Sequence, residues 1–342
     1  MKVLILGGTG MIGPGMARGF HDAGHEVALF TRTARADPDL PPHRALRGDR
    51  SNPADLAAAA AVAAWDLVID NVAFNAADVR GALAAFPNAH RYVLCSSEVV
   101  YRFAPSSRLL PAVEDAVDFD ARPPDEDPRD PGWAYARGKL EAERVLRDQS
   151  PVPWTVLRPA IIHGPRDPAA RGNWYVARVL AGGPILLADG GTASFRLAFS
   201  TDVARAVVLA ATAPEAEAQA YNLAQSEVLT LRDFIADQAA VLGVTPDFLG
   251  IPREFVGPLG GPFADLVNHV PDASRIRREL GFQPTPWADF ARTTALACRD
   301  RAGTLDALLA TRAAELDLAA RWRAATASLA PDNPRGSHLP RP

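Results

Sequence analysis

Residues 7–13 read Gly7-Gly8-Thr9-Gly10-Met11-Ile12-Gly13 and lie between an apolar run at residues 3–6 and a helical pattern at residues 13–23. Glycines that follow a strand and open a helix predict a dinucleotide-binding turn. Gly7 permits the tight turn, Gly10 lets a pyrophosphate reach backbone N–H groups at the positive end of the helix, and Gly13 lets the helix pack close to the sheet. We therefore expect the cofactor to contact Gly7, Gly10, Met11, Ile12 and Gly13. The alternative is a turn in which the glycines are only structural.

The first half of the chain alternates short strand patterns with Ala-rich helical patterns. Strands are expected at residues 3–6, 26–31, 44–46, 66–71, 91–95 and 154–157, with helices at residues 13–23, 53–64, 77–86 and about 133–149 between them. This alternation predicts an α/β fold, a Rossmann-type doubly wound parallel sheet with helices on both faces.

Beyond residue 165 the elements are shorter, and Gly and Pro are more frequent. We expect a dinucleotide-binding Rossmann domain at residues 1–165, a smaller C-terminal lobe at residues 166–330 that is interleaved with the first domain, and a disordered tail at residues 331–342. Residues 102–132 contain a stretch rich in Pro and acidic residues, so we expect a surface loop of the first domain that can form a lid.

The composition is that of a globular protein. The 342 residues are 48% hydrophobic and 22% charged, with a net charge of −4. The acidic net charge and the lack of a long basic run disfavour a nucleic-acid-binding protein, and no apolar stretch reaches the roughly 18 residues of a membrane span. Cys95 and Cys298 form neither a disulfide framework nor a zinc pattern, so no metal is expected and the cytoplasm is the natural compartment.

The end of the second predicted strand indicates which dinucleotide binds. In this fold an acidic residue at that position usually holds the ribose hydroxyls of NAD(H). This chain has Thr31-Arg32 there, and a guanidinium can bind a 2′-phosphate through two hydrogen bonds. NADP(H) is therefore favoured over NAD(H), the alternative being that Arg32 is simply solvated. Asp49 follows the third strand and is placed to reach the adenine, or else forms a plain turn.

Tyr135 and Lys139 are four residues apart in a predicted helix, so their side chains share one face. An unperturbed tyrosine titrates near pH ~10, which is too high for acid–base work at neutrality. A lysine ammonium beside the phenol favours the phenolate and lowers that pKa. The pair is therefore a candidate acid–base site, and a packed aromatic residue is the alternative for Tyr135.

Together, these motifs resemble the extended short-chain dehydrogenase/reductase family, the NAD(P)-dependent epimerase/dehydratase group. The resemblance rests on the glycine turn, on Ser96-Ser97 at a strand end and on Tyr135-x-x-x-Lys139, and it covers about residues 1–245. Shorter matches are Leu157-Arg158-Pro159 and the segment at residues 199–206. The family resemblance implies that the smaller lobe binds the substrate.

The resemblance also implies a role for each matched side chain. The hydroxyl of Ser97 would hydrogen-bond the reacting alcohol or carbonyl oxygen, with the neighbouring Ser96 as the alternative. Tyr135 would move the proton at that oxygen. Lys139 would bind the nicotinamide ribose and lower the pKa of Tyr135, while the nicotinamide gives or takes the hydride.

Three positions depart from the family pattern. Family dehydratases place an Asp-Glu pair after the catalytic Thr, whereas this chain has Glu98-Val99, so a two-carboxylate elimination is disfavoured. Glu98 is expected as a single acid or base, or as a structural glutamate. His163 replaces a common Tyr and is a candidate substrate contact, with packing as the alternative. Arg196 lies near the position of a phosphate-binding arginine and is the third candidate.

The leading hypothesis is an NAD(P)-dependent oxidoreductase or epimerase that exchanges a hydride at a secondary alcohol or ketone of a sugar-like substrate. The alternative is an NADPH-dependent ketone reductase of secondary metabolism. A non-catalytic dinucleotide sensor or an RNA-associated protein is the alternative from another class, and the intact Tyr135 and Lys139 disfavour it. We expect a small-molecule substrate, no nucleic-acid or membrane partner, and a homodimer, because family members are often dimers.

Overall fold

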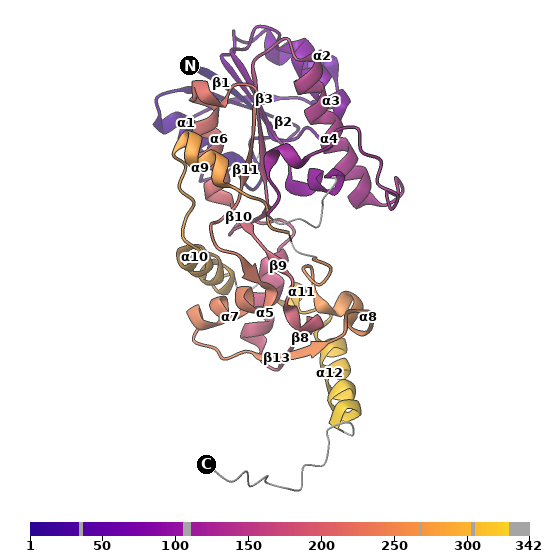
Figure 1. Cartoon of the computed structure of the whole chain (residues 1–342). Helices are drawn as coiled ribbons and strands as arrows, with labels where there is room; N and C mark the ends of the chain where they lie inside the picture. The colour runs from indigo at the N-terminus through magenta and orange to yellow at the C-terminus, as the bar shows by residue number, and fades with distance from the viewer. Residues whose placement is uncertain (34–36, 105–110, 267–268, 302–304, 328–342) are drawn as a thin grey trace, which may run out of the picture. The chain divides into compact units, whose positions relative to one another are not determined.

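The structure is a computed structural model that describes residues 1–33, 37–104, 111–266, 269–301 and 305–327 (Figure 1). The chain forms two compact units. The first contains residues 1–170, 193–229 and 266–294, and the second contains residues 171–192, 230–265 and those from 295 on. The first unit therefore continues past residue 165 and takes in two later segments of the chain. The tail expected at residues 331–342 lies outside the described residues.

A seven-stranded parallel sheet forms the centre of the first unit, in the order β11-β6-β5-β4-β1-β2-β3. The strands are β1 (Lys2–Leu6), β2 (Glu26–Thr31), β3 (Arg44–Arg47), β4 (Leu67–Asp70), β5 (Arg91–Cys95), β6 (Trp154–Pro159) and β11 (Gln219–Leu223). The strand order reverses between β1 and β4, and ligands of such sheets bind beyond the carboxyl ends of the strands at that point. The α/β fold predicted from the sequence is confirmed.

Helices cover both faces of this sheet (Figure 1). They are α1 (Gly13–Asp22) and α6 (Ser200–Thr212) on one face, and α2 (Pro53–Ala60), α3 (Ala76–Ala85) and α4 (Pro131–Gln149) on the other. Within β1, Val3 and Ile5 pack with the first pair of helices, whereas Leu4 and Leu6 pack with the other three. Because successive side chains of a strand point to opposite faces, an unbroken apolar strand is the pattern of a sheet buried on both sides.

The first unit also contains shorter elements. These are α9 (Ser274–Leu280), β7 (Ile161–His163) paired with β10 (Leu197–Phe199), β9 (Ser194–Phe195), and the 3₁₀ helices η1 (Glu98–Phe103) and η2 (Glu114–Ala116). The division between the two units falls within two elements along the chain, β12 (Leu229–Thr230) and α10 (Trp287–Arg299).

Helices α1 and α6 approach each other closely because α1 carries two further glycines. A Cβ added to Gly15 would lie 2.9 Å from the Cβ of Ala204, and one added to Gly19 would lie 2.9 Å from a methyl group of Val208. Contacts below 3 Å force a displacement, so a larger residue at either position would separate the helices. These glycines follow the recognised motif, and their partners lie almost 190 residues later in the sequence.

The segment expected to be a surface loop, residues 102–132, is in part buried. Phe103 and Glu114 are inside the protein, 0% and 5% exposed. The acidic part is held to α4, since Glu126 pairs with Arg137 and Asp120 pairs with Arg144. The described part of this loop is therefore packed against the first unit along much of its length.

The second unit is built around a short parallel pair of strands, β8 (Pro184–Ala188) and β13 (Asp247–Ile251). Its helices are α5 (Arg171–Ala181), α7 (Leu231–Val241), α8 (Arg253–Val256), α11 (Leu305–Leu308) and α12 (Arg312–Ala327). The fully buried Arg178 of α5 pairs with Glu315 of α12 and stacks on the ring of Trp174. This ion pair anchors α12 to the rest of the unit.

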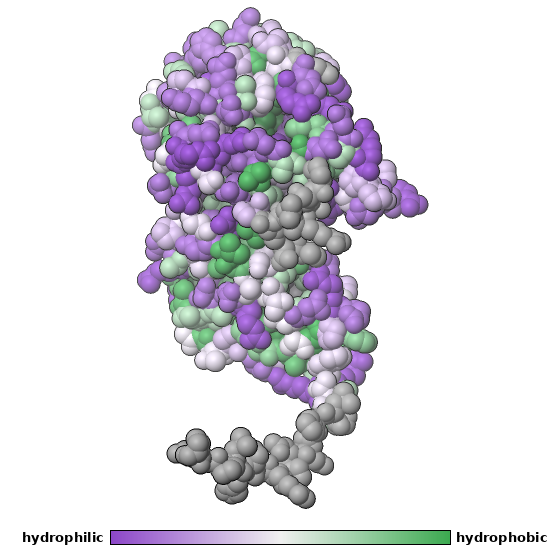
Figure 2. Space-filling model, in the orientation of Figure 1, coloured by the Kyte–Doolittle hydropathy of each residue, from purple (hydrophilic) through white to green (hydrophobic). Residues whose placement is uncertain are grey.

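The surface of the first unit is mostly hydrophilic on the face drawn in Figure 2, with hydrophobic residues in small separate areas. This agrees with a sheet whose apolar faces are covered by helices. Among the described residues, no helix combines the length and apolar character that a membrane span needs.

Candidate active site

The glycine turn joins β1 to α1 at the carboxyl end of the sheet. Gly7 has a φ of +83°, a conformation that favours glycine, and a Cβ there would lie 2.3 Å from a methyl group of Val72. The turn is fixed by the Gly7 N–H, which donates to Phe30 O, and by the Asn71 amide, which donates to Gly7 O. A Cβ at Gly10, by contrast, would meet nothing within 4 Å. The open space at Gly10, in front of the first turn of α1, fits a dinucleotide pyrophosphate.

Gly13 has a more local role than the sequence suggested. A Cβ at this position would lie 2.2 Å from the carbonyl oxygen of Gly8, within the same turn. Gly13 therefore lets the turn fold back on the start of α1, while Gly15 and Gly19 permit the close packing of α1. Ile12 is buried and Met11 is half-buried, with the Met11 methyl 3.6 Å from the position of a Cβ on Gly164.

Lys139 is held at the ends of two neighbouring strands. Its Nζ donates to Ala73 O at 2.7 Å, just beyond β4, and to Cys95 O at 2.8 Å, at the end of β5. The side chain is only 3% exposed, and this burial lowers the pKa of Lys139. The cation is thus placed near the carboxyl ends of β4 and β5 and keeps little mobility.

Tyr135 lies on the same face of α4 as Lys139, one turn earlier. Its side chain is 38% exposed, and its ring centroid lies 5.8 Å from Lys139 Nζ. Phe74 packs beside both residues, with its ring 6.3 Å from that of Tyr135 and 5.2 Å from Lys139 Nζ. The predicted pair is therefore brought together, with the phenol at the surface and the ammonium inside.

Ser96 and Ser97 differ in their surroundings. Ser96 is buried, and its hydroxyl donates to the carboxylate of Glu143 on α4. Ser97 is half-buried, begins η1, and accepts a hydrogen bond from the backbone N–H of Val99 at 3.3 Å. Because the Ser96 hydroxyl is engaged inside the protein, Ser97 is the better candidate for contact with a ligand.

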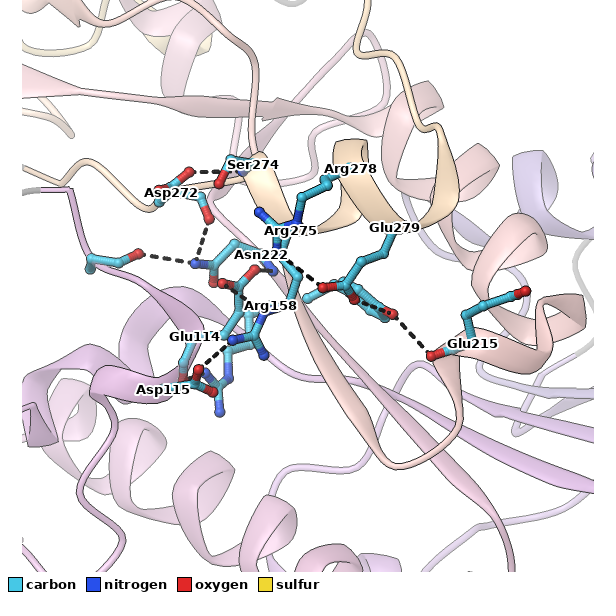
Figure 3. A network of polar contacts seen from close by, with 12 residues as sticks. Glu114, Asp115, Arg158, Glu215, Asn222, Asp272, Ser274, Arg275, Arg278 and Glu279 are labelled. Atoms are coloured by element: carbon cyan, nitrogen blue, oxygen red, sulfur yellow. Dashed lines mark hydrogen bonds and ion pairs between the residues drawn. The ribbon is translucent and has the colours of Figure 1, made fainter.

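Behind these serines lies a buried polar network that the sequence analysis did not predict. Arg158 of β6 binds Glu143 through two nitrogens, and its Nη1 donates to Glu114 O at 2.7 Å and to the Tyr101 hydroxyl at 3.2 Å. Figure 3 shows Arg158 and Asn222 gathered around Glu114. The sequence contained one indication of this network, because Glu143 lies four residues after Lys139 in the same predicted helix and therefore shares its face.

A second buried polar network that the sequence did not predict lies at the carboxyl end of β4. The buried Asp70 at the end of β4 receives two hydrogen bonds from Arg50 at 2.7 Å and one from the Tyr92 hydroxyl. Arg50 also donates to Asp78 O of α3. Burial, followed by the charge of Asp70, raises the pKa of Tyr92 well above its usual range. The network fixes the end of β4, the strand that precedes Val72 and Ala73.

The residues proposed to choose between NADP(H) and NAD(H) are at the surface. Arg32 is exposed just beyond β2, and the Thr31 hydroxyl donates to Thr33 O at 3.2 Å. Asp49 accepts hydrogen bonds from the N–H and the hydroxyl of Ser51, and these bonds lower the pKa of Asp49. Arg32 and Asp49 are close enough for the charge of Arg32 to act on Asp49.

The three candidate substrate residues have different environments. Glu98 is buried directly after Ser97, and its Oε1 lies 4.0 Å from Nδ1 of His269. His163 is 1% exposed and packs against the ring of Phe290 at 5.7 Å. Arg196 is half-buried and donates to two backbone carbonyls, Pro271 O at 2.8 Å and Ser226 O at 3.0 Å. Glu98 directly follows Ser97 in the sequence, and this adjacency connects it to the Ser97, Tyr135 and Lys139 set.

A cavity of about 490 Å³ also opens in the first unit, along β6 and β11. Its lining includes Glu114, Glu143, Arg147, Trp154, Arg158 and Arg275. Acidic and basic side chains alternate there, and most of them pair with one another. None of the site residues predicted from the sequence lines this cavity. The candidate active site is instead the set Ser97, Tyr135 and Lys139, which lies just beyond β5 and on α4.

Comparison with known proteins identifies the family of the chain. The NAD dependent epimerase/dehydratase family matches residues 3–224. The chain belongs to this family. It is an enzyme of the epimerase/dehydratase type within the short-chain dehydrogenases/reductases, as the motifs predicted.

Similar sequences differ in their activities. The chain is 30% identical to chloroplast stem-loop binding protein of 41 kDa b from Arabidopsis thaliana over 72% of its own length, and the match spans 64% of that relative. It is 27% identical to 2′-dehydrokanamycin reductase of Streptomyces kanamyceticus, over 75% of this chain and 70% of the reductase.

Solved structures show the same fold. UDP-glucose 4-epimerase from Thermotoga maritima, solved with UDP-glucose, aligns with a TM-score of 0.71 at 16% identity over 88% of this chain and 100% of the epimerase. The Thermus thermophilus UDP-glucose 4-epimerase, solved with NAD, aligns with a TM-score of 0.66 at 21% identity over 87% of this chain and 99% of that one. At these identities the likeness concerns the fold alone.

Proposed function

We propose that the protein uses NADP(H) to exchange a hydride at a secondary alcohol or ketone of a sugar-like substrate. The observation that carries the proposal is the position of Lys139, whose buried ammonium is fixed by Ala73 O and Cys95 O beside the exposed ring of Tyr135. A bound nicotinamide would give or take the hydride. The protein's own residues would bind the substrate and move the proton.

Each side chain of the site has a proposed task. The hydroxyl of Ser97 would hydrogen-bond the reacting oxygen. Tyr135 would give its phenolic proton to that oxygen during reduction and take it back during oxidation. Lys139 would hold the nicotinamide ribose hydroxyls and favour the phenolate through its positive charge. Two strand-end carbonyls orient the ammonium, so Lys139 needs little rearrangement to do so.

The preference for NADP(H) rests on the end of β2. The position directly after Thr31 is occupied by Arg32 and not by an acidic residue, and the exposed Arg32 can bind a 2′-phosphate. Titration of the purified protein with NADPH and NADH tests this proposal. We expect tighter binding of NADPH, with at least a tenfold loss in Arg32→Ala and little change in Arg80→Ala, which removes an exposed arginine of α3. Equal affinities for both cofactors would refute the preference.

Two net reactions are compatible with this chemistry. Reduction with release of the oxidised cofactor would make the protein a reductase. The names of two relatives suggest this reaction, 2′-dehydrokanamycin reductase and 2-alkyl-3-oxoalkanoate reductase. Return of the hydride within the same site would make it an epimerase, as the names of the structural neighbours suggest. The nucleotide that co-purifies with the protein distinguishes them, since tightly held oxidised cofactor indicates an epimerase.

The decisive experiment compares the wild type with Tyr135→Phe. Both proteins are incubated with NADPH and a panel of ketones and nucleotide sugars, and substrate turnover is measured. We expect Tyr135→Phe to lose at least about 100-fold in kcat/KM with unchanged NADPH affinity, because general acid catalysis contributes about 10²–10⁴-fold. Equal turnover of every accepted substrate by both proteins would refute the assignment. Light scattering on the same samples tests the homodimer that the family resemblance implies.

A second candidate function is binding of an RNA stem-loop. The relative with 30% identity is named as a stem-loop binding protein, and this name alone favours the second candidate. The net charge of −4 disfavours it, because phosphate contacts need clustered cations. A filter-binding assay with a stem-loop RNA at 50 mM and 200 mM salt decides the matter, and a salt-dependent complex would support this second function.

A further inference from the structure

We propose that His269 belongs to the active site and that, with Glu98, it binds a hydroxyl group on the carbon next to the reacting carbonyl. The proposed substrate class is therefore the α-hydroxy ketones and the corresponding diols. This inference rests on the proposed function for the position of the carbonyl oxygen at Ser97. The proximity of Glu98 and His269, with Oε1 4.0 Å from Nδ1, is observed independently of that function.

The first support is the position of Glu98. It follows Ser97 directly at the start of η1, and its side chain is 8% exposed. A buried carboxylate needs a positive or hydrogen-bonding partner, because burial without one is costly. The imidazole of His269 is placed to become such a partner, because its Nδ1 lies 4.0 Å from Oε1 of Glu98. Catalytic hydrogen bonds are often long in the absence of ligand and shorten when the substrate binds.

The second support is how His269 reaches this position. Its backbone N–H donates to Ser194 O at 2.9 Å, and its carbonyl accepts from Arg196 N at 2.8 Å. The residue is thus fixed beside β9 although it lies about 170 residues after Glu98 in the sequence. The side chain is 39% exposed, so one edge of the ring can contact a ligand.

The charge state of His269 suits a hydrogen bond to a neutral hydroxyl. Burial, and next the positive charge of Arg102 on η1, lower the pKa of His269, so the imidazole is neutral at neutral pH. With its proton on Nδ1 directed to Glu98, Nε2 accepts a hydrogen bond from a substrate hydroxyl. A hydroxyl on the carbon adjacent to the carbonyl is the substituent nearest to an oxygen held by Ser97.

The test compares two ketones that differ by one hydroxyl group, 3-hydroxybutanone and butanone, in an NADPH oxidation assay. We expect the wild type to prefer 3-hydroxybutanone about 2- to 10-fold in kcat/KM, the range of one hydrogen bond between neutral groups. His269→Phe and Glu98→Gln should each bring this ratio close to one. The matched control is His90→Phe, which removes an exposed histidine 3.4 Å from Asp66, and it should keep the ratio. An unchanged ratio in His269→Phe would overturn the proposal.

A second measurement does not depend on turnover. The pKa of His269 is followed by NMR in the wild type and in Glu98→Gln, with His269→Phe used for assignment. Loss of the carboxylate should lower that pKa by at least half a unit, because a nearby negative charge favours the imidazolium. A difference below 0.2 units would overturn the pairing.

The failure of this inference can be told apart from failure of the proposed function. Tyr135→Phe should reduce the turnover of both ketones equally, whereas His269→Phe should reduce that of the hydroxy ketone selectively. Activity retained in Tyr135→Phe would refute the proposed function. The preference for the hydroxy ketone would then still be measured by the ratio of kcat/KM for the two ketones in His269→Phe and Glu98→Gln. If the wild type reduces neither ketone, the proposed function fails for these substrates, and the NMR titration alone decides whether Glu98 and His269 form a pair.

Discussion

Arg158 and Glu143 form an ion pair inside the first unit, with Nη2 and Oε2 2.6 Å apart and both side chains at most 3% exposed. The pair connects β6 to α4, and the hydroxyl of Ser96 donates to the same carboxylate. Because Glu143 lies one helical turn beyond Lys139, the pair fixes the part of α4 that carries Lys139. Stability and the alignment of the site are therefore coupled at this position.

Removing one partner of this pair should strongly destabilise the protein. In Glu143→Gln, Arg158 would remain buried with an uncompensated charge, and we expect a loss of about 3–5 kcal/mol in the free energy of unfolding. Urea denaturation measures it, with Asp148→Asn as the control because Asp148 pairs with Arg147 at the surface. The double variant Glu143→Leu/Arg158→Met should recover part of the loss. A stability of Glu143→Gln within 1 kcal/mol of wild type would contradict this account.

The two neighbouring serines should respond differently to substitution by alanine. Ser97→Ala removes the hydroxyl proposed to contact the reacting oxygen, and we expect kcat to fall about 100- to 1,000-fold with little change in unfolding. Ser96→Ala removes a hydrogen bond to Glu143 and should lower stability by about 1–3 kcal/mol, because the carboxylate loses a buried donor. Steady-state kinetics and urea denaturation of both variants measure these effects. The reverse pattern would show that Ser96 is the catalytic hydroxyl.

Gly10→Ala and Gly13→Ala should separate cofactor binding from folding. At Gly10 a methyl group meets no protein atom within 4 Å, so we expect normal stability and at least a tenfold weaker affinity for NADPH, because the methyl occupies pyrophosphate space. At Gly13 the methyl would lie 2.2 Å from Gly8 O, so the turn must shift and both stability and affinity should fall. Thermal melts and calorimetric titration measure the two effects. Unimpaired NADPH binding in Gly10→Ala would contradict the placement of the cofactor.

Local features of the sequence were enough to predict the fold and the proximity of Tyr135 and Lys139. The glycine turn, the apolar strands and the i, i+4 spacing of Tyr135 and Lys139 each depend on residues close together in the chain. The structure places them as expected, because a strand, a turn and a helix have fixed geometry. The sequence alone could not distinguish the roles of Ser96 and Ser97. The two serines differ in burial and in the contact of Ser96 with Glu143, and both differences are visible only in the structure.

The unpredicted parts of the site depend on contacts between distant residues. His269 reaches Glu98 through backbone pairing with β9, and the partners of Gly15 and Gly19 lie on α6. No spacing rule within one helix or strand can relate residues that are so far apart in the sequence. For Arg196, the position in the sequence suggested a phosphate contact. The structure adds that its guanidinium donates to two backbone carbonyls, which the sequence did not predict.

The two cysteines should be almost unreactive in the folded protein. Burial raises the pKa of Cys95 to about 12 and that of Cys298 to about 11. At pH 8 the reactive thiolate is then roughly one part in 10⁴ for Cys95 and one in 10³ for Cys298.

The unfolded chain exposes thiols with a pKa near ~8.5, so it loses these protons first as the pH rises. The free energy of unfolding should therefore fall as the pH increases above about 8.5, and less steeply in Cys95→Ala. Reaction with a thiol-specific disulfide reagent at pH 8 should be slow in buffer and complete for both thiols in urea. Rapid labelling of Cys95 in buffer would show that the end of β5, where Cys95 O holds Lys139, opens readily.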